Sequence, residues 1–333
     1  MTKKALLLVN VGTPDKPTQK YVRKFLTSFL NDLRVIDLPW LLQKFLVNVI
    51  IIPLRNKNST QLYKLLWTKE GSPLMVYLKN LEKKLQFKFG NDYHVFGVMR
   101  YENPSLLKTL KTIKEGFFTD LVVLPLFPQY ASSTSGTVSE YVMKEIKKWN
   151  IIPNIRIINQ FYEHPLFIEA FARRITSYKP ETYDHILFSY HGLPNRHLDK
   201  SHPGVKCTSC NCDKGIPEHG KLCYRATCYE TTRLIAQKLG LDKNKYTTTF
   251  QSRLSKNWMT PFTDETLVNL AKTGTKKVLV TTPAFVADCL ETIVEINVEN
   301  GDLFKKSGGE ALTLVESLND TDDWVNAVVE IIK

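Results

Sequence analysis

The chain has 333 residues, enough for one large domain or two medium ones. With 43% hydrophobic residues, 15 Gly and 16 Pro, its composition excludes a disulfide-rich miniprotein, a low-complexity tail and a coiled coil. The 45 Lys and Arg residues outnumber the 33 Asp and Glu residues, which favours an anionic partner such as nucleic acid, an acidic membrane surface or a polycarboxylate ligand. Because the basic residues are scattered and form no compact block, we expect no nucleic-acid partner.

Two apolar segments bear on the location of the protein. Residues 5–9 are too few for the core of a signal peptide, and no small-residue cleavage site follows them. Residues 38–54 form the longest apolar stretch, but prolines and polar side chains interrupt it, so it does not read as a membrane span. We therefore expect a soluble, cytoplasmic protein, at most peripheral to the inner membrane. The alternative for residues 38–54 is a hydrophobic helix that the rest of the protein covers.

Short apolar runs alternate with amphipathic segments along the whole chain. The runs that predict buried strands are 5–11, 94–99, 121–126, 155–158, 186–190, 246–251 and 277–282. The segments that predict helices are 61–87, 104–115, 138–149, 164–174, 229–239, 264–272 and 324–332. Continuous apolar strands separated by helices predict parallel sheets with both faces covered, and ligands then bind beyond the carboxyl ends of the strands.

The two halves of the chain resemble each other. Three pairs of segments match in the same order: 5–14 with 185–194, 96–100 with 248–253, and 121–127 with 278–285. We therefore predict an α/β fold of two similar Rossmann-like lobes, residues 1–150 and 151–319, each with a parallel β-sheet flanked by helices and with a ligand cleft between them. A C-terminal helix within 320–333 is expected to pack back on the first lobe.

His191 stands out among the seven histidines. It follows the predicted strand 186–190 and precedes Gly192 and Pro194, so we expect it on a sharp turn at the carboxyl end of a buried strand. An imidazole there can act as a general base or as a metal ligand near neutral pH. A hydrogen-bonded structural role is the alternative for any single histidine.

Four acidic residues follow the last predicted strand at spacings of three, four and four: Asp288, Glu291, Glu295 and Glu299. On a helix this spacing stacks the carboxylates along one face. A column of carboxylates that enters a ligand site can pass along a divalent cation or accept protons. A solvated acidic stripe on an amphipathic helix is the alternative.

Several separated motifs match one enzyme family, in order and nearly from end to end. They are Leu-Val-Asn-Val-Gly-Thr-Pro at 8–14, Phe-Leu-Asn-Asp-Leu-Arg-Val-Ile at 29–36, Glu-Gly-Ser-Pro-Leu at 70–74, Met-Arg-Tyr-Glu-Asn-Pro-Ser at 99–105, Pro-Leu-Phe-Pro-Gln-Tyr at 125–130, His-Gly-Leu-Pro at 191–194, Phe-Gln-Ser-Arg at 250–253, Trp258, and Asp-Cys-Leu-Glu-Thr at 288–292. With these motifs the chain resembles the ferrochelatases, lyases that insert ferrous iron into a porphyrin in haem biosynthesis.

The resemblance implies roles for the acidic residues and the histidine. His191 and Glu291 match the catalytic residues that bind the substrate iron or take up the pyrrole protons. Glu295 and Glu299 match an acidic path for metal or protons. Whether His191 first removes protons or first receives iron stays open at this point; we favour proton removal because of its place at a strand end.

The resemblance also implies porphyrin contacts. Asp288, Arg100, Tyr101 and Trp258 match residues of the porphyrin cleft, where an arginine can pair with a propionate and an aromatic ring can lie beside the macrocycle. Relatives that use coproporphyrin carry Tyr at the position of Val11, whereas those that use protoporphyrin carry an apolar residue. The expected substrates are therefore protoporphyrin IX and Fe²⁺, with no organic cofactor.

Five of the six cysteines lie within 22 residues after the turn at His191: Cys207, Cys210, Cys212, Cys223 and Cys228. Thiolates at this spacing suit an iron–sulfur cluster or tetrahedral zinc. The insertion resembles that of bacterial ferrochelatases with a [2Fe–2S] cluster, so we expect Cys207, Cys210, Cys212 and Cys223 as ligands. Cys228 is the alternative fourth ligand, because a cysteine at its position also resembles one found in relatives without a cluster.

Zinc is the competing metal, with His202 or His219 as a substitute ligand, and free reduced thiols are the remaining alternative. Other functions also stay open: a coproporphyrin ferrochelatase, a chelatase for another metal and tetrapyrrole, or a non-catalytic haem- or metal-binding protein. Residues 38–54 fall where related enzymes carry a hydrophobic lip over the pocket, which implies peripheral membrane contact. We expect a monomer or a homodimer.

Overall fold

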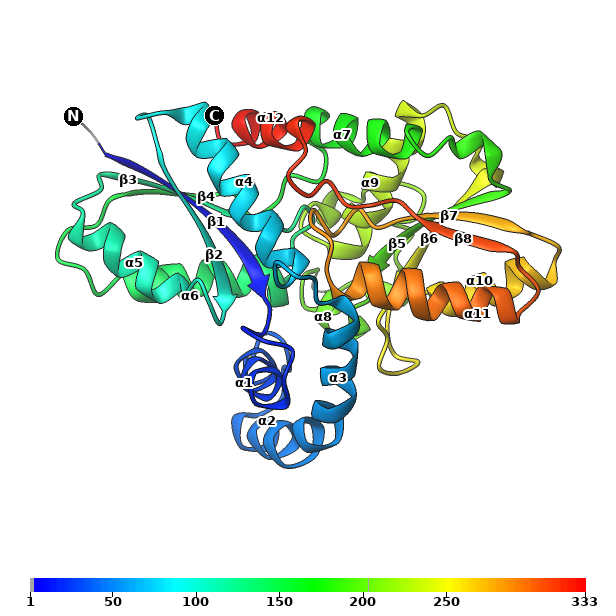
Figure 1. The fold of residues 1–333 in the computed structure, drawn as a ribbon, viewed down its shortest axis with the longest axis horizontal. Helices are drawn as coiled ribbons and strands as arrows, with labels where there is room; N and C mark the ends of the chain where they lie inside the picture. The colour runs from blue at the N-terminus through cyan, green and yellow to red at the C-terminus, as the bar shows by residue number, and fades with distance from the viewer. Residues whose placement is uncertain (1–2, 203) are drawn as a thin grey trace. The chain divides into compact units, whose positions relative to one another are not determined.

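The structure is a computed structural model that describes residues 3–202 and 204–333. The chain divides into two compact units, each built around its own sheet (Figure 1). The first unit comprises the residues up to Phe127, Ala131–Gln160 and Ile332–Lys333. The second comprises Pro128–Tyr130 and Phe161–Ile331.

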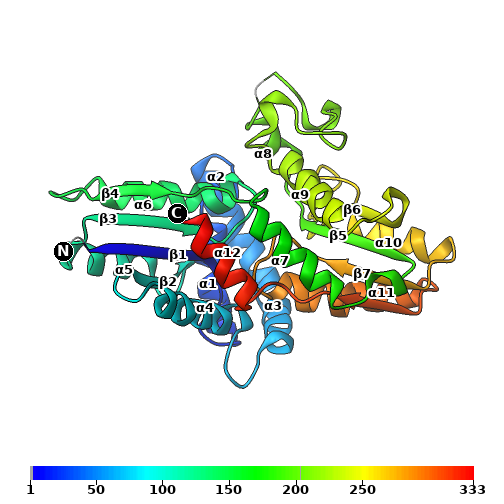
Figure 2. The same cartoon turned by 90° about the horizontal axis from the view of Figure 1, so that it is seen from above.

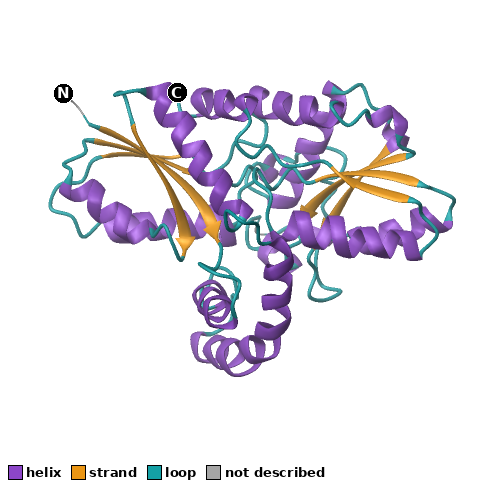
Figure 3. Ribbon diagram, in the orientation of Figure 1, coloured by secondary structure: helices purple, strands orange, loops and turns teal. Residues whose placement is uncertain are grey.

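The first unit contains a four-stranded parallel sheet in the order β2-β1-β3-β4. Its strands are β1 (Lys4–Gly12), β2 (His94–Tyr101), β3 (Asp120–Pro125) and β4 (Asn154–Ile157). Its helices are α1 (Gln19–Leu30), α2 (Trp40–Phe45), η1 (Leu46–Ile51), α3 (Ile52–Leu66), α4 (Pro73–Phe89), α5 (Leu106–Glu115), η2 (Ser132–Gly136) and α6 (Thr137–Ile146). Alternate β1 side chains pack with α5 and α6 on one face, and α4 lies along β2. Helices therefore cover both faces (Figure 3), as continuous apolar strands require.

The second unit repeats this plan with the order β6-β5-β7-β8. Its strands are β5 (His185–His191), β6 (Tyr246–Gln251), β7 (Lys277–Thr281) and β8 (Ala311–Leu314). Its helices are α7 (Pro165–Thr176), η3 (Pro180–Thr182), α8 (Asn195–Asp199), η4 (Cys207–Ser209), η5 (Glu218–Gly220), α9 (Tyr224–Lys238), η6 (Lys243–Lys245), α10 (Thr263–Lys272), η7 (Leu290–Asn300), α11 (Gly301–Lys306) and α12 (Asp322–Ile331). One face packs on α10, η7 and α11, while α7 packs against α9 and α12 (Figure 2).

The equivalent strand orders confirm the prediction of two similar α/β units with parallel sheets. All seven predicted strands are present, and β8 was missed because it has only four residues, all half-buried. The predicted helix 61–87 is two helices, α3 and α4, with a break between them. Gly71 lies in this break at φ +120°, and Pro73 starts α4, so neither residue suits a helix interior.

The boundary between the units differs from the prediction. Because β4 pairs with β3, the first unit extends to Gln160 rather than to residue 150. The C-terminal helix also differs, since α12 belongs to the second unit and packs on α7. The fully buried Trp324 of α12 lies 5.6 Å from Phe161 and 6.1 Å from Phe167, measured between ring centroids. Apolar contact with these rings holds α12 in the second unit.

In the first unit, α1, α2, η1 and α3 extend beyond the sheet (Figure 1). Their outer side carries a group of exposed apolar side chains that we call the apolar helical surface: Trp40, Leu41, Leu42, Phe45, Val49, Ile50 and Leu54. The inner side is packed, with Leu30, Val47 and Ile52 in one buried cluster. The segment is thus buried on one side and exposed on the other. Among the helices of the described residues, none is long and apolar enough to cross a membrane.

Candidate active site

The last residue of β5 is His191, in register with Gln251 at the end of β6. Its Nδ1 lies 2.6 Å from the carbonyl oxygen of Gly192, which can only accept, so Nδ1 carries the proton and Nε2 keeps the lone pair in the neutral ring. The amide of Gly192 donates to Gln251 O at 2.8 Å, and a Cβ at position 192 would lie 2.8 Å from the same oxygen. Glycine is therefore required here, and the tight turn presents a half-buried imidazole with a free basic nitrogen.

Two aromatic rings flank His191 in the second unit. Trp258 lies 6.4 Å and Phe285 lies 6.5 Å from the imidazole, between ring centroids. A β-bridge between Pro194 and Trp258 fixes the indole beside the turn. The arrangement gives the imidazole an apolar border, which suits a flat ligand.

Glu295 is held by the residue that follows β6. The Ser252 amide donates to Glu295 Oε1 at 2.6 Å and the Ser252 hydroxyl donates to Oε2 at 2.5 Å. Ser252 has φ +63°, a left-handed conformation that is unusual for a residue with a side chain. Gln251 Nε2 adds a third donor at 3.3 Å from Oε2. Burial raises the pKa of the Glu295 carboxyl, and the charge of Glu291 raises it further. The hydrogen bonds from Ser252 and the electrostatic effect of His191 lower this pKa but do not outweigh burial.

The expected acidic helix is present as η7, a π-helix. Its i→i+5 bonds make it wider than an α-helix, and residues four apart still share a face. Glu291 and Glu295 are half-buried, whereas Glu299 is exposed. The three carboxylates therefore run from the interior of the second unit to its surface, while Val294 and Ile296 face the core.

Asp288 differs from the other three acids because its side chain is 4% exposed. Oδ1 accepts from the Thr292 hydroxyl at 3.0 Å and from the Ser317 amide at 3.2 Å, and Oδ2 accepts from Asn319 Nδ2 at 2.8 Å. The Asp288 amide returns a bond to Asn319 Oδ1 at 2.8 Å. These bonds make Asp288 the anchor of the first turn of η7, and its expected contact with the macrocycle stays a prediction.

In the first unit, Arg100 and Tyr101 end β2 and meet at Asp32. Asp32 Oδ2 accepts from Arg100 Nη2 at 2.9 Å, from the Tyr101 hydroxyl at 2.8 Å and from the Thr137 hydroxyl at 2.6 Å. Burial opposes ionisation of Asp32, but the bonds from Thr137, the Arg34 amide and Tyr101, with the charge of Arg100, outweigh it and lower its pKa. Burial and the charge of Asp32 raise the pKa of Tyr101, so its phenol stays protonated.

The cysteine loop lies within the second unit. Cys212 and Cys223 share a buried cluster that Cys210 and Tyr229 pack against, and Cys207 is also buried. Burial raises the pKa of Cys207 to about 11 and that of Cys212 to about 12, so both thiols are neutral at pH 7.

Arg225 joins this loop to the start of α9. Its Nη1 lies 3.2 Å from Cys212 Sγ and 3.4 Å from the carbonyl oxygens of Cys207 and Cys210. Cys228, the alternative ligand, is fully buried within α9, and its thiol pKa is raised by burial. Within the described residues no three His, Cys, Asp or Glu side chains stand in ligating geometry. The side chain of His219 lies outside the described part of the chain.

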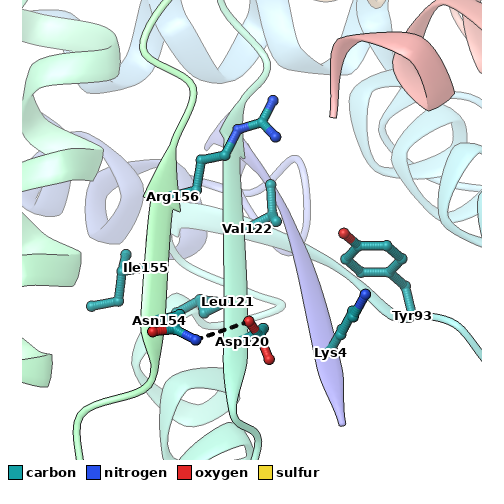
Figure 4. A pocket seen from close by; sticks show the side chains of 8 residues that line it. All are labelled: Lys4, Tyr93, Asp120, Leu121, Val122, Asn154, Ile155 and Arg156. Atoms are coloured by element: carbon teal, nitrogen blue, oxygen red, sulfur yellow. Dashed lines mark hydrogen bonds between the residues drawn. The ribbon is translucent and has the colours of Figure 1, made fainter. Parts of the chain in front are cut away.

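A shallow pocket of about 200 Å³ lies at the amino ends of β1, β3 and β4, away from the end of the first sheet that carries Arg100 and Tyr101 (Figure 4). Lys4, Tyr93 and Arg156 help to line it, and Asn154 donates to Asp120 at 3.2 Å. Ligands of parallel sheets bind at the carboxyl ends of the strands. The pocket therefore lies at the amino ends of the strands, whereas the expected ligand would bind at their carboxyl ends.

Sequence reasoning missed Ser252 and Asp32 as site residues, although both lie inside motifs quoted for the resemblance. The type and sequence position of these two residues do not predict the role that each one has. Only the left-handed turn of Ser252 and the contact of Asp32 with Arg100, 68 positions away, reveal what they do.

These observations define a chelatase-like α/β protein with a histidine and a carboxylate column at strand ends. Among solved structures, SirB from Bacillus subtilis with Fe³⁺ is similar in fold, with TM-score 0.56, 11% identity, and coverage of 99% of this chain and 96% of SirB. A chelatase-like multi-domain protein from Deinococcus radiodurans gives TM-score 0.55 and 10% identity, covering all of this chain and 55% of that one.

The sequence gives the family. Residues 3–333 match the Ferrochelatase family model. The ferrochelatase of Legionella pneumophila (strain Lens) is 41% identical over 331 residues, 99% of this chain and 98% of that one. The ferrochelatase of Coxiella burnetii (strain Dugway 5J108-111) is 41% identical over 336 residues, 98% of this chain and 92% of the relative. The chain belongs to the ferrochelatase family, lyases that insert a metal into a porphyrin in haem biosynthesis.

We predict that Ser252→Ala lowers kcat about tenfold at neutral pH, because a hydrogen bond to a charged group is worth about 1.5–3 kcal/mol. The acid limb of the pH–rate profile should also move to higher pH, since the lost donor stabilised ionised Glu295. Metal insertion into porphyrin between pH 5 and pH 9 measures both effects. Ser255→Ala, on an exposed loop, is the control. An unshifted profile would show that the hydroxyl does not hold Glu295 in a form that matters for the rate.

Proposed function

We propose that the chain is a protoporphyrin-type ferrochelatase, which inserts Fe²⁺ into protoporphyrin IX and forms protohaem with release of two protons. The observation that carries the proposal is His191 at the end of β5, whose Nδ1 is bonded to Gly192 so that Nε2 keeps its lone pair, and which interacts electrostatically with Glu295. A base with a free lone pair beside a carboxyl of raised pKa is a proton-accepting pair.

Metal insertion requires removal of two pyrrole protons. His191 Nε2 is the group we assign to the first step, because its other nitrogen is bonded to Gly192. Glu295, whose pKa burial raises, is the next group that we assign to proton transfer, and the exposed Glu299 on the same helix gives the protons an exit to solvent. The carboxylates of η7 thus act as a proton path.

Ferrous iron is the metal substrate in this proposal. Imidazole nitrogen and carboxylate oxygen are both suitable ligands for it, and His191 with Glu291 supplies one of each. Asp288 anchors the start of η7 and so keeps Glu291 in position. We assign the binding of iron to Glu291, with His191 Nε2 as a second ligand only while it carries no proton, and the positioning to Asp288.

Protoporphyrin IX is the proposed porphyrin because the residues we assign to it are apolar, aromatic or charge-paired. Val11 is an apolar, half-buried side chain at the end of β1, and Trp258 is the aromatic residue beside His191. Tyr101 is held protonated and Arg100 is ion-paired. Within each unit, apolar and charge-paired residues of this kind suit vinyl groups better than further carboxylates.

An anaerobic assay with Fe²⁺ and protoporphyrin IX, followed by the loss of free-porphyrin fluorescence, tests the proposal. We expect turnover by the wild type and at least a hundredfold loss of kcat in His191→Ala and Glu291→Gln, since each removes an acid–base or ligand group worth about 10²–10⁴ in rate. His185→Ala, whose imidazole bonds to Thr247 at 2.8 Å, is the matched control.

Other outcomes separate the competing functions. Turnover only with coproporphyrin would replace the substrate, and turnover only with another metal would replace the metal. Binding of porphyrin or haem without turnover under any of these conditions would replace the enzyme with a binding protein. His191→Ala that keeps normal kcat but loses affinity for iron would overturn the proton role of His191.

We also propose that Cys207, Cys210, Cys212 and Cys223 hold a [2Fe–2S] cluster. The donor set fits, because these thiols lie in one loop and three of them are buried. Arg225 reaches Cys212 Sγ and the carbonyl oxygens of Cys207 and Cys210. A bound cluster would supply four iron–thiolate bonds that tie the loop to the start of α9. Since the sulfurs do not stand in ligating geometry in this structure, the side chains must close around the cluster.

Anaerobic purification followed by iron, sulfide and zinc analysis tests the cluster. We expect about two iron and two sulfide per chain, lost in Cys212→Ser and retained in Cys228→Ser. Cys228 is buried within α9 and serves as the control. Stoichiometric zinc in a colourless protein would replace the cluster with a zinc site, and a loss in Cys228→Ser with retention in Cys223→Ser would exchange the fourth ligand.

We further propose that the apolar helical surface contacts a lipid bilayer. Its apolar side chains lie on one side of the helical segment, and the other side packs in a buried cluster. Leu41 and Leu54 are about three-quarters exposed and Trp40 is more than half exposed. Partial insertion of such side chains into lipid gains about 1.5–3 kcal/mol for each large apolar residue.

Sedimentation with vesicles of mixed neutral and anionic lipid tests this contact. Trp40→Ser/Leu41→Ser should weaken binding at least tenfold, because two exposed apolar side chains are lost. Phe87→Ser, on α4 and 87% exposed, should leave binding unchanged. Equal binding of the double variant and the wild type would exclude this surface as the lipid contact.

A further inference from the structure

The ends of β1 and β2 form one edge of the first unit. The register pairs Asn10 with Met99 and Gly12 with Tyr101, which sets Val11 opposite Arg100. An apolar side chain and a guanidinium are therefore neighbours at the edge where ligands of parallel sheets bind. The ligand groups that bind at this edge depend on whether a nearby anion compensates the charge of Arg100.

The charge of Arg100 is compensated within the protein. Arg100 Nη2 lies 2.9 Å from Asp32 Oδ2, with the two side chains 15% and 11% exposed. The guanidinium also lies between two rings, 4.6 Å from the centroid of Tyr101 and 4.3 Å from that of Tyr141. Arg100 Nε donates to the Thr137 hydroxyl at 3.0 Å. Since the pair is largely out of water, solvent screens it little, and Asp32 cancels most of the positive potential.

Two further cations in this part of the first unit are also paired with carboxylates. Arg34 pairs with Glu140 and also bonds to the Ser132 hydroxyl at 2.9 Å. Lys24 lies 2.5 Å from the largely buried carboxylate of Glu102, the residue that follows β2. The three cations named here are therefore compensated by carboxylates, although the chain carries a net charge of +12.

We propose that Asp32 is a specificity-determining residue, which cancels the charge of Arg100 and thereby disfavours porphyrins with additional carboxylates. The inference rests on the proposed function, since it concerns the choice between porphyrins at the same site. Coproporphyrin carries four carboxylates, whereas protoporphyrin carries two. A free arginine would bind a further carboxylate strongly and in bidentate fashion. Paired with Asp32, it offers no net charge to attract a further carboxylate.

Asp32→Asn removes the charge and keeps the shape; its amide oxygen can still accept from Tyr101 and Thr137, and only the bond from the Arg34 amide is lost. Arg100→Gln leaves the Asp32 carboxylate without its cation and should act in the opposite direction. The double variant Asp32→Asn/Arg100→Gln removes both charges and should return near to the wild type. Asp15→Asn, an exposed carboxylate that accepts from Asn103 at 3.1 Å, is the control for a surface charge change.

The measurement is the ratio of dissociation constants for metal-free protoporphyrin IX and coproporphyrin III, from fluorescence quenching, together with KM and kcat for each. We expect Asp32→Asn to move the ratio at least threefold, and about tenfold if one carboxylate binds Arg100, toward coproporphyrin. Arg100→Gln should move it the other way, the double variant should restore it within threefold, and Asp15→Asn should not change it. A ratio within threefold of the wild type in both single variants would overturn the proposal.

Two further outcomes are decisive. If Asp32→Asn does not fold, as judged by thermal melting, Arg100→Gln alone decides by the direction of its shift. If the wild type metallates neither porphyrin, the proposed function fails, while the binding ratio still tests Asp32 on its own. A wild type that binds neither porphyrin would overturn both.

Discussion

The parallel pairing of β5 with β6 is the contact on which the second unit depends. It sets His191 opposite Gln251, and the next residue on each strand then completes the site. Gly192 bonds back to Gln251, which aims the imidazole, and Ser252 turns into a left-handed conformation, which aims two donors at Glu295. A shift of one residue in this register would separate the base from the carboxylate, because side chains alternate faces along a strand.

A buried polar chain supports this register from behind. The Ser189 hydroxyl lies 2.8 Å from Gln251 Oε1 and 2.9 Å from the Thr263 hydroxyl, which donates to Thr249 at 3.0 Å. All four residues are nearly inaccessible to solvent. Because buried polar groups are costly when unpaired, this chain holds Gln251 in one orientation. Its Nε2 is thereby available to the Glu291 carbonyl at 2.8 Å and to Glu295.

The periodicity of the sequence predicted the strands and helices of the fold better than it predicted the residues of the site. Strand cores such as residues 5–9 are apolar because both sheet faces are covered, so their positions could be predicted. His191 could be predicted because a strand, a glycine and a proline surround it. The roles of residues joined by distant contacts could not be predicted. Asp32 meets Arg100 only after β2 pairs with β1, and Asp288 accepts a hydrogen bond from Asn319, 31 positions later.

The π-helical form of η7 and the short strand β8 could not be predicted from the sequence for a related reason. The spacing of the acids suits an α-helix and a π-helix almost equally, so sequence cannot choose between them. The four half-buried residues of β8 carry no strong alternation of apolar and polar side chains, and only pairing with β7 makes them a strand.

The two units place a carboxylate beside equivalent strands but stabilise it differently. Strands β2 and β6 occupy the same position in their sheets. In the first unit, a permanent cation faces Asp32, and the pKa of the carboxyl is lowered. In the second, neutral donors from Ser252 and Gln251 hold Glu295, and burial raises its pKa. An anion paired with arginine keeps its charge across the physiological range and can set electrostatic potential. In both units burial raises the pKa and hydrogen bonds lower it, so the balance between the two decides the outcome. Bonds and the nearby cation outweigh burial at Asp32, whereas burial prevails at Glu295, whose carboxyl therefore takes up a proton more readily, as the proposed proton path requires.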